Sequence, residues 1–472
     1  MLSAAIRDIK SIERVRHEGR IVGIEGLRIE AAGPREALRL GSSVRFERPD
    51  GPRGELVGFK GEHAIILAND DLDGLSPGSP VYFSTGVDVV RPCDGWLGRV
   101  INAFGEPLDG KGPLIHGERM RPVRAAAPNP QARARVDQRM ALGVRAMDVF
   151  APCAQGQRLG LFAGSGVGKS TLMSMLARNA EADVVVIGLI GERGREVREF
   201  VEDTLGPEGL ARSVVVTATS DEAAPSRRRA AWLTLAVAEH FRDAGKRVVC
   251  FLDSVTRFAM AQREIGLAAG EPPTTRGYTP SVFAELPKLL ERAGPGPIAA
   301  PGAPQGSITG LFTVLVDGDD HNEPVSDAVR GILDGHITLS RAVAERGRFP
   351  AVDVLKSISR LNQILLGDAE RELAVRARRL MSLYSNMEEL VRIGAYARGA
   401  DPEVDEAVRL HPQLEAFLAQ GVGERIDPAE AFAALAQILG PQAQPQAVAP
   451  VQPAQKAPQV QTQRPPGQAA RA

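Results

Sequence analysis

The chain has 472 residues, of which 43% are apolar and 24% charged; this is an ordinary globular composition and, at roughly 150 residues per domain, indicates about three domains. The formal net charge of −1 argues against nucleic acid as the main partner. Three cysteines (Cys93, Cys153 and Cys250) lie far apart, which argues against a disulfide framework or a zinc site and makes a reducing cytoplasm the expected location.

The N-terminal segment, residues 1–20, is predicted to be helical because apolar residues such as Leu2, Ile6 and Ile9 recur at helical spacing. Charged residues begin at Arg7, so the segment lacks the apolar core of a signal peptide. No run of about 18 apolar residues occurs in the sequence. We therefore expect no membrane-spanning helix and at most a peripheral membrane contact.

Residues 21–95 are predicted to form a small β-barrel domain. Short apolar runs alternate there with Gly, Pro and Asp turn signals, a pattern typical of short, evenly spaced strands. The clearest runs cover residues 21–24, 56–59, 64–67 and 81–83.

Residues 96–360 are predicted to form an α/β domain on a mainly parallel sheet, with a proline-containing linker over residues 113–135. Continuous apolar runs alternate with amphipathic segments of helix length, as expected for strands that are buried on both faces. The predicted strands cover residues 158–162, 184–190, 214–217, 247–252 and 308–316.

The C-terminal part divides into a helical domain and a tail. Residues 361–439 are rich in Leu, Ala, Arg and Glu and are predicted to be all helical. Residues 440–472 are rich in Pro, Gln and Ala, and no acidic residue follows Glu430. Such a tail cannot bury enough apolar surface to fold, so we expect it to be disordered.

The segment AGSGVGKST at 163–171 is predicted to be a phosphate-binding loop between a strand and a helix over residues 170–179. Glycines let backbone N–H groups turn inward, Lys169 would reach the β- and γ-phosphates, and the Ser170 hydroxyl would bind Mg²⁺. Ala163 departs from the strict pattern, and a glycine-rich turn without a ligand is the alternative. The predicted binding residues are Gly164, Ser165, Gly166, Val167, Gly168, Lys169, Ser170 and Thr171.

Two carboxylates follow predicted strands, and ligands of open α/β sheets lie at such strand ends. Asp253 follows the strand over 247–252 and is a second candidate ligand for Mg²⁺, although an aspartate there could instead cap the next helix. Glu192 follows the strand over 184–190 and could accept a proton from the attacking water, although it could also be a solvated surface residue. Candidate γ-phosphate contacts, each of which could also be a surface residue, are Arg193, Arg195, Arg257 and Arg360.

Longer motifs resemble the catalytic subunits of the rotary ATPase family from about residue 20 to residue 438. The likeness is greatest to the flagellum-specific protein export ATPases and their type III secretion relatives. The motifs are GRVINAFGEPLDGKGP at 98–113, LGLFAGSGVGKSTL at 159–172, GLIGERGREVREF at 188–200, ATSDEAAPSRRRAAWLTLAVAEHFRDAGKRVVCFLDSVTRFAMAQRE at 218–264, GSITGLFTVLVDGDDHNEPVSDAVRGILDGHITLSR at 306–341, RFPAVDVLKSISR at 348–360 and IGAYARGADPEVDEAV at 393–408.

This resemblance implies a β-barrel, a RecA-like ATPase domain and a helical C-terminal domain, in a homohexameric ring with ATP and Mg²⁺ bound between subunits. It assigns the catalytic carboxylate to Glu192, phosphate contacts to Lys169, Arg193 and Arg257, and an arginine finger for the neighbouring subunit's site to Arg360. It also places Phe349 against the adenine, although Phe349 could equally be a core residue.

The function that the resemblance implies is ATP hydrolysis that assists type III export of flagellar proteins across the cytoplasmic membrane. The implied partners are a stator-like negative regulator, a central stalk protein, export chaperone–substrate complexes and a membrane export gate. For the N-terminal segment, binding of the regulator or of acidic lipid stands beside a frayed, solvated helix.

Four other functions stay open from the sequence. A virulence-type secretion ATPase shares the same site chemistry, and copurification with a proton channel would indicate a subunit of a proton-coupled rotary ATPase. A ring-shaped nucleic-acid motor would show RNA-stimulated activity with a steep salt dependence, but no RNA-recognition motif occurs. A non-hydrolysing nucleotide-bound scaffold is disfavoured by Glu192.

Overall fold

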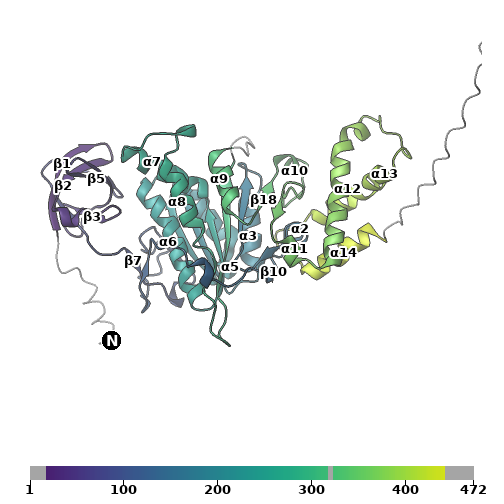
Figure 1. Cartoon of the computed structure of the whole chain (residues 1–472), viewed down its shortest axis with the longest axis horizontal. Coiled ribbons are helices and arrows are strands. Elements are labelled where there is room, and N and C mark those ends of the chain that lie inside the picture. Colours follow the sequence, from purple (N-terminus) through teal and green to yellow (C-terminus); the bar gives the residue numbers. More distant parts are fainter. Residues whose placement is uncertain (1–16, 317–322, 442–472) are drawn as a thin grey trace, which may run out of the picture.

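Figure 1 shows a computed structural model of the chain, which describes residues 17–316 and 323–441. A small barrel, a central α/β domain and a group of helices follow one another along the long axis (Figure 1), which confirms the predicted fold class. The predicted N-terminal helix and C-terminal tail lie almost entirely outside the described residues. Residues 17–20 form part of a strand, so the helical prediction is wrong for these four positions.

The N-terminal domain is a closed six-stranded barrel with the order β1-β2-β5-β4-β3-β6. It closes because His17–Arg20 at the start of β1 pair with residues 80–83 of β6, so the barrel begins at His17 and not at residue 21. Its core contains Ile29, Phe46 and Leu56, all fully buried. The strands are β1 (His17–Glu25), β2 (Arg28–Ala32), β3 (Ser43–Phe46), β4 (Arg53–Lys60), β5 (His63–Ala68) and β6 (Pro80–Phe83).

The central domain contains a nine-stranded sheet in the order β19-β18-β12-β17-β15-β13-β14-β8, with β16 beside β17. All neighbours are parallel except for β16 and β19, which pair antiparallel. Each of the five predicted strands is present, whereas β8 and β18 were not predicted. The strands are β8 (Arg99–Ile101), β12 (Arg158–Ala163), β13 (Val184–Glu192), β14 (Ser213–Thr219), β15 (Arg247–Asp253), β16 (Gly294–Pro295), β17 (Ser307–Leu315), β18 (Gly335–Leu339) and β19 (Ile358–Ser359).

Helices cover both faces of this sheet and bury two apolar clusters. One cluster joins α3 to the C-terminal helices, and the other joins α6, α7 and α8 to the opposite face. The helices are α2 (Arg145–Phe150), α3 (Lys169–Asn179), α4 (Gly194–Glu199), α5 (Gly206–Ala211), α6 (Ala224–Asp243), α7 (Val255–Ala268), α8 (Pro280–Leu290), α9 (Pro324–Ile332) and α10 (Arg341–Glu345). A π-helical turn, Phe200–Leu205, links α4 to α5.

The segment predicted as a linker has little regular structure. Its strand β9 (Arg121–Pro122) pairs with β7 (Val89–Val90) beside the central domain. A second small sheet joins β10 (Arg139–Met140) to β11 (Cys153–Ala154), ahead of the phosphate loop. All three cysteines are free thiols.

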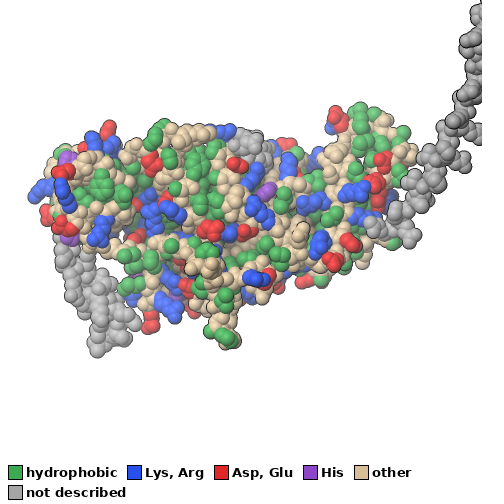
Figure 2. All heavy atoms as spheres, viewed as in Figure 1, with side chains coloured by type: hydrophobic (Ala, Val, Ile, Leu, Met, Phe, Trp, Pro, Cys, Tyr) green, Lys and Arg blue, Asp and Glu red, His purple; other side chains and the backbone are tan. Residues whose placement is uncertain are grey.

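The C-terminal helices are α11 (Asn362–Leu365), α12 (Asp368–Arg392), α13 (Pro402–Leu418) and α14 (Pro428–Leu439). The last two begin at well-formed N-caps: Asp401 accepts from two backbone N–H groups and Asp427 from one, and each is followed by proline, whose fixed φ suits the first helical position. None of the helices in the described part of the chain is both long and apolar enough to cross a bilayer. Figure 2 shows cationic and anionic side chains intermingled over the visible face.

Candidate active site

The predicted phosphate loop connects the end of β12 to the start of α3. Gly166 and Gly168 adopt φ values of 76° and 88°, which side chains with a Cβ rarely adopt. Gly168 is the N-cap of α3, so the free N–H groups of the first helical turn face the loop. The loop lines a cavity of about 530 Å³, large enough for the phosphates of a nucleotide. Val167 is the exception among the predicted residues, since its side chain is buried in the core.

Lys169 contacts both of the predicted carboxylates, Asp253 and Glu192. Its Nζ atom lies 2.5 Å from Asp253 Oδ1 and 3.5 Å from Glu192 Oε1. The contact arises because β13 and β15 are parallel neighbours in which Leu189 is level with Asp253. Burial opposes the charge of Lys169, but the two carboxylates outweigh it and raise the pKa of the ammonium. The cation is therefore held charged at the strand ends, where a phosphate would arrive.

Asp253 is fixed by a residue that the sequence did not single out. Thr313 Oγ1, on neighbouring strand β17, donates to Asp253 Oδ1 at 2.6 Å. The alternative reading of Asp253 as a helix cap does not hold, because Ser254 is the N-cap of α7 and its side chain accepts from the N–H of Arg257. Asp253 is thus free to act in the site.

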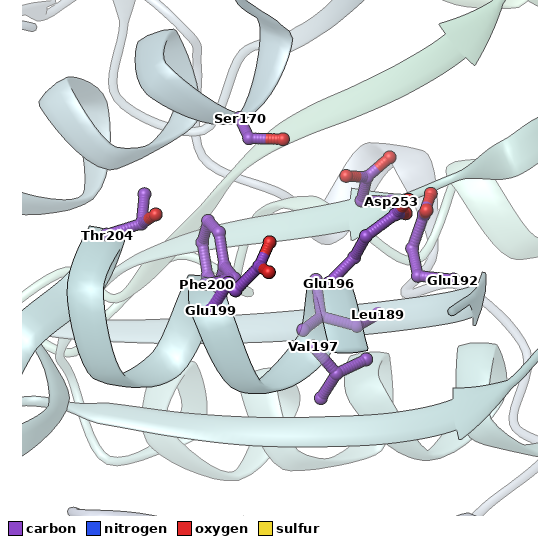
Figure 3. Close-up of a pocket in the computed structure, with 9 residues that line it drawn as sticks. All are labelled: Ser170, Leu189, Glu192, Glu196, Val197, Glu199, Phe200, Thr204 and Asp253. Atoms are coloured by element: carbon purple, nitrogen blue, oxygen red, sulfur yellow. The ribbon is translucent and has the colours of Figure 1, made fainter. Parts of the chain in front are cut away.

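Glu192 is strongly affected by its surroundings. Burial raises its pKa to about 7; Lys169 opposes this, and the carboxylates of Asp253 and Glu196 reinforce it. Glu196, on α4, lines both the phosphate-loop cavity and a second cavity of about 130 Å³ behind it. Figure 3 shows Glu196 reaching toward Glu192 and Asp253, with Ser170 across the space. A carboxylate titrating near neutral pH is suited to general-base chemistry.

Of the candidate arginines, Arg257 and Arg193 line the phosphate-loop cavity, whereas Arg195 does not. Arg257 lines the cavity beside Gly191, and its Nε atom is buried with no acceptor among the described residues, so its charge is available for a ligand. Arg193 also lines the cavity but its side chain is 75% exposed and pairs with Glu196 at 3.4 Å. Arg195 is outside the cavity lining, and its 72% exposed side chain pairs with Glu199 at 3.5 Å.

Phe349 lies beside the phosphate loop. A Cβ placed on Gly168 would contact its ring at 3.5 Å, and the side chain is 46% exposed. An exposed aromatic ring at this position is available for stacking, so the core-residue alternative does not hold. Arg341, which the sequence did not single out, donates to the Ser165 carbonyl at 3.2 Å on the same side of the loop.

Arg360 is not brought to this site. It follows β19, where Ser359 is level with Gly335 at the start of β18, whereas the phosphate loop follows the end of parallel strand β12. Its side chain is exposed and donates to the Arg330 carbonyl at 3.2 Å. From this place Arg360 is at the opposite end of the sheet from the phosphate loop of its own chain.

Ser170 in the first turn of α3 and the carboxylates at the strand ends suit a magnesium–nucleotide complex. Ser170, Asp253 and Glu192 offer only oxygen atoms, the donor type that Mg²⁺ prefers. Across residues 17–316 and 323–441, no three His, Cys, Asp or Glu side chains are placed to hold a metal ion.

Comparison with known proteins gives matches along most of the chain. The nucleotide-binding domain of the ATP synthase alpha/beta family matches residues 143–359, and the C-terminal domain of the type III secretion ATPase EscN matches residues 366–437. A flagellum-specific ATP synthase of Caulobacter vibrioides is 57% identical over 441 residues, covering 93% of this chain and 99% of that protein.

Two solved structures of EscN from enteropathogenic Escherichia coli share the fold. The assembled ATPase superimposes with a TM-score of 0.83 at 39% identity, covering 89% of this chain and 100% of that one. EscN in complex with its central stalk EscO gives a TM-score of 0.80 at the same identity and coverage. The likeness therefore extends from the barrel to the C-terminal helices.

Proposed function

The chain belongs to the ATP synthase alpha/beta family, in its branch of flagellar and type III secretion ATPases, and from this premise we propose that it hydrolyses ATP to assist type III export of flagellar proteins. The flagellar assignment is supported by the 57% identity to a flagellum-specific relative, compared with 46% to a type 3 secretion system ATPase of Xanthomonas euvesicatoria. The match to the EscN C-terminal domain favours an export ATPase over a proton-coupled rotary subunit.

The observation that carries the proposal is the meeting of Lys169, Asp253 and Glu192 at the strand ends. In the proposed mechanism Lys169 leaves the carboxylates to neutralise the β- and γ-phosphates. Glu192 then orients a water molecule for in-line attack and accepts its proton. Ser170 and Asp253 would hold Mg²⁺, which supplies positive charge to the phosphate oxygens.

The remaining site residues act on the nucleotide from its other sides. Arg257 and Arg193 contact phosphate oxygens from the cavity wall, and Phe349 packs on the adenine. Arg360 reaches the site of a neighbouring subunit in a homohexameric ring, because its own site lies beyond its reach. A central stalk protein is a proposed partner, by analogy with the complex of EscN and EscO. A stator-like regulator, chaperone–substrate complexes and an export gate are proposed from the family likeness alone.

The test combines hydrolysis with export. Purified Glu192→Gln protein should bind ATP with about the wild-type affinity and hydrolyse it at least about 100-fold more slowly, because amide replaces the base. In a strain that lacks the gene, wild-type protein should restore secretion of hook and filament proteins, and Glu192→Gln should restore much less. Wild-type turnover in the mutant would refute the role of Glu192, and normal flagella without the gene would refute the flagellar assignment.

A further inference from the structure

Residues 341–352, here called the Phe349 segment, connect the phosphate loop to the C-terminal helices. One end contacts the loop through Arg341, which donates to the Ser165 carbonyl, and through the Phe349 ring beside Gly168. The other side of the segment faces α12 and α13. The position of the aromatic ring therefore depends on contacts with a different domain.

Arg348, the residue next to Phe349, makes the strongest of these contacts. Its Nε atom lies 2.9 Å from Glu415 Oε2 on α13, an ion pair without hydrogen-bond geometry, and the side chains of Arg348 and Glu415 are 7% and 34% exposed. Its other nitrogens donate to the carbonyls of Pro350 and Val352, at 3.4 and 3.0 Å. Glu415 thus supplies the counter-charge for a buried guanidinium whose remaining donors bind the backbone of the Phe349 segment.

A backbone contact fixes Phe349 itself. Its carbonyl accepts from the Gln420 N–H at 2.9 Å, just beyond the end of α13. The buried Gln420 side chain is anchored in turn, since it accepts from Arg145 N at 2.9 Å and donates to the Gly143 carbonyl at 2.8 Å. The turn after α13 is therefore a fixed support for this segment.

A third contact is weaker. Arg346 pairs with Glu388 on α12 at 3.0 Å, but the two side chains are 56% and 35% exposed. Exposed pairs contribute little because solvent screens them and their side chains lose entropy on pairing. The two pairs differ at the arginine, because the Arg348 guanidinium is buried whereas that of Arg346 is exposed, so the pair of Arg348 with Glu415 is the one that can determine where the ring lies.

We propose that Glu415 of α13 is a positioning residue for nucleotide binding, acting through Arg348 on Phe349. The inference rests on the proposed contact of Phe349 with the adenine. Neither Glu415 nor Phe349 is among the residues that line the phosphate-loop cavity, but the Phe349 ring lies beside Gly168 of the loop. Without its carboxylate, Arg348 would carry an unpaired buried charge and move toward solvent, displacing the adjacent ring. The C-terminal helical domain then contributes to nucleotide affinity without touching the nucleotide.

The test measures ATP binding in the Glu192→Gln background, so that hydrolysis does not interfere. Glu415→Gln should weaken ATP binding roughly three- to tenfold, and Glu415→Ala at least as much. In the otherwise wild-type enzyme, Glu415→Gln should raise KM by a similar factor and leave kcat within about twofold. The matched control is Glu406→Gln, which removes another partly buried ion pair between α13 and α12, to Arg376 at 2.6 Å, that does not reach the Phe349 segment.

A double-mutant cycle with Phe349→Ala separates positioning from a general structural role. If Glu415 acts through the ring, Glu415→Gln should have no further effect on ATP binding in the Phe349→Ala protein. A full effect of Glu415→Gln in that background, or none alone, overturns the inference. If Phe349→Ala itself leaves ATP binding unchanged, the proposed adenine contact is wrong. The inference about Glu415, which depends on that contact, is then wrong as well.

Discussion

The surroundings of Glu192 change the acid–base properties of a common side chain. An exposed glutamate is almost fully ionised at neutral pH and a weak base. Here burial and the nearby carboxylates of Asp253 and Glu196 raise its pKa to about 7, against the opposing charge of Lys169. At or above neutral pH, much of a base with this pKa is ionised and ready to accept a proton. The same pKa makes it basic enough to keep that proton once it has been accepted.

This pKa predicts the pH dependence of hydrolysis. Since the ionised form of Glu192 is required, kcat/KM should rise about tenfold per pH unit below about pH 7 and level off above it. Glu196→Gln should move the midpoint to lower pH, because it removes a neighbour that raises the pKa of Glu192. The measurement is a pH profile of kcat/KM for both proteins. A flat profile between about pH 6 and pH 8, or a midpoint that moves upward in the mutant, contradicts the assignment.

Single residues were predictable where their sequence context is distinctive. Glu192, Asp253 and Lys169 each follow an apolar strand or a glycine-rich loop, and the structure brings them together. Thr313 was not predicted, because a threonine within an apolar run gives no sign that its hydroxyl faces a carboxylate on the next strand. Glu196 was missed although it lies only four residues after Glu192, in the first turn of α4.

The phosphate loop and α3 act as one element, because the loop ends at the helix N-cap. Gly168→Ala should lower the free energy of unfolding by about 1–2 kcal/mol, since alanine is strained at a φ of 88°. It should also weaken ATP binding at least about tenfold, because relief of the strain turns the backbone N–H groups away from the phosphates. Denaturant unfolding and nucleotide titration measure the two effects.

Gly331→Ala is the control for that substitution. Gly331 lies in α9 with open space around its Cα, so alanine should leave ATP binding unchanged and stabilise the helix by up to about 1 kcal/mol. Equal effects of the two substitutions on ATP binding would show that the backbone conformation of the loop is not what binds phosphate.

At the level of elements, long buried strands were predictable and short ones were not. The five predicted strands are segments of at least four residues in which apolar residues predominate. In contrast, β18 reads GHITL, and its glycine, histidine and threonine conceal a strand that is buried by its neighbours. Strand β8 has three residues, too few for a periodic pattern. The strand at residues 17–20 was missed because barrel closure, a long-range pairing with β6, overrides local helical spacing.

At the level of the whole molecule, the residues proposed to act in ATP hydrolysis lie in two separate places in one chain. The phosphate loop, Lys169 and Glu192 lie at one end of the sheet, and Arg360 lies near the start of β18 at the sheet edge. Sequence patterns do not indicate which residues of two different subunits lie together. The proposed pairing of Arg360 with a neighbour's site therefore rests on family resemblance alone. Within one chain Arg360 and the phosphate loop lie at opposite ends of neighbouring strands, so a role for Arg360 in hydrolysis is proposed at a neighbour's site.

The most direct test of this account is a mixing experiment with two inactive variants. Glu192→Gln retains Arg360, and Arg360→Ala retains Glu192, so a mixed ring contains interfaces at which both residues are wild type. With random mixing at equal amounts about a quarter of the interfaces are complete, because ring contacts are head-to-tail. The mixture should therefore hydrolyse ATP far faster than either variant alone at the same total concentration. If differently tagged subunits copurify as mixed rings and the mixture is no more active than its components, the shared site is contradicted.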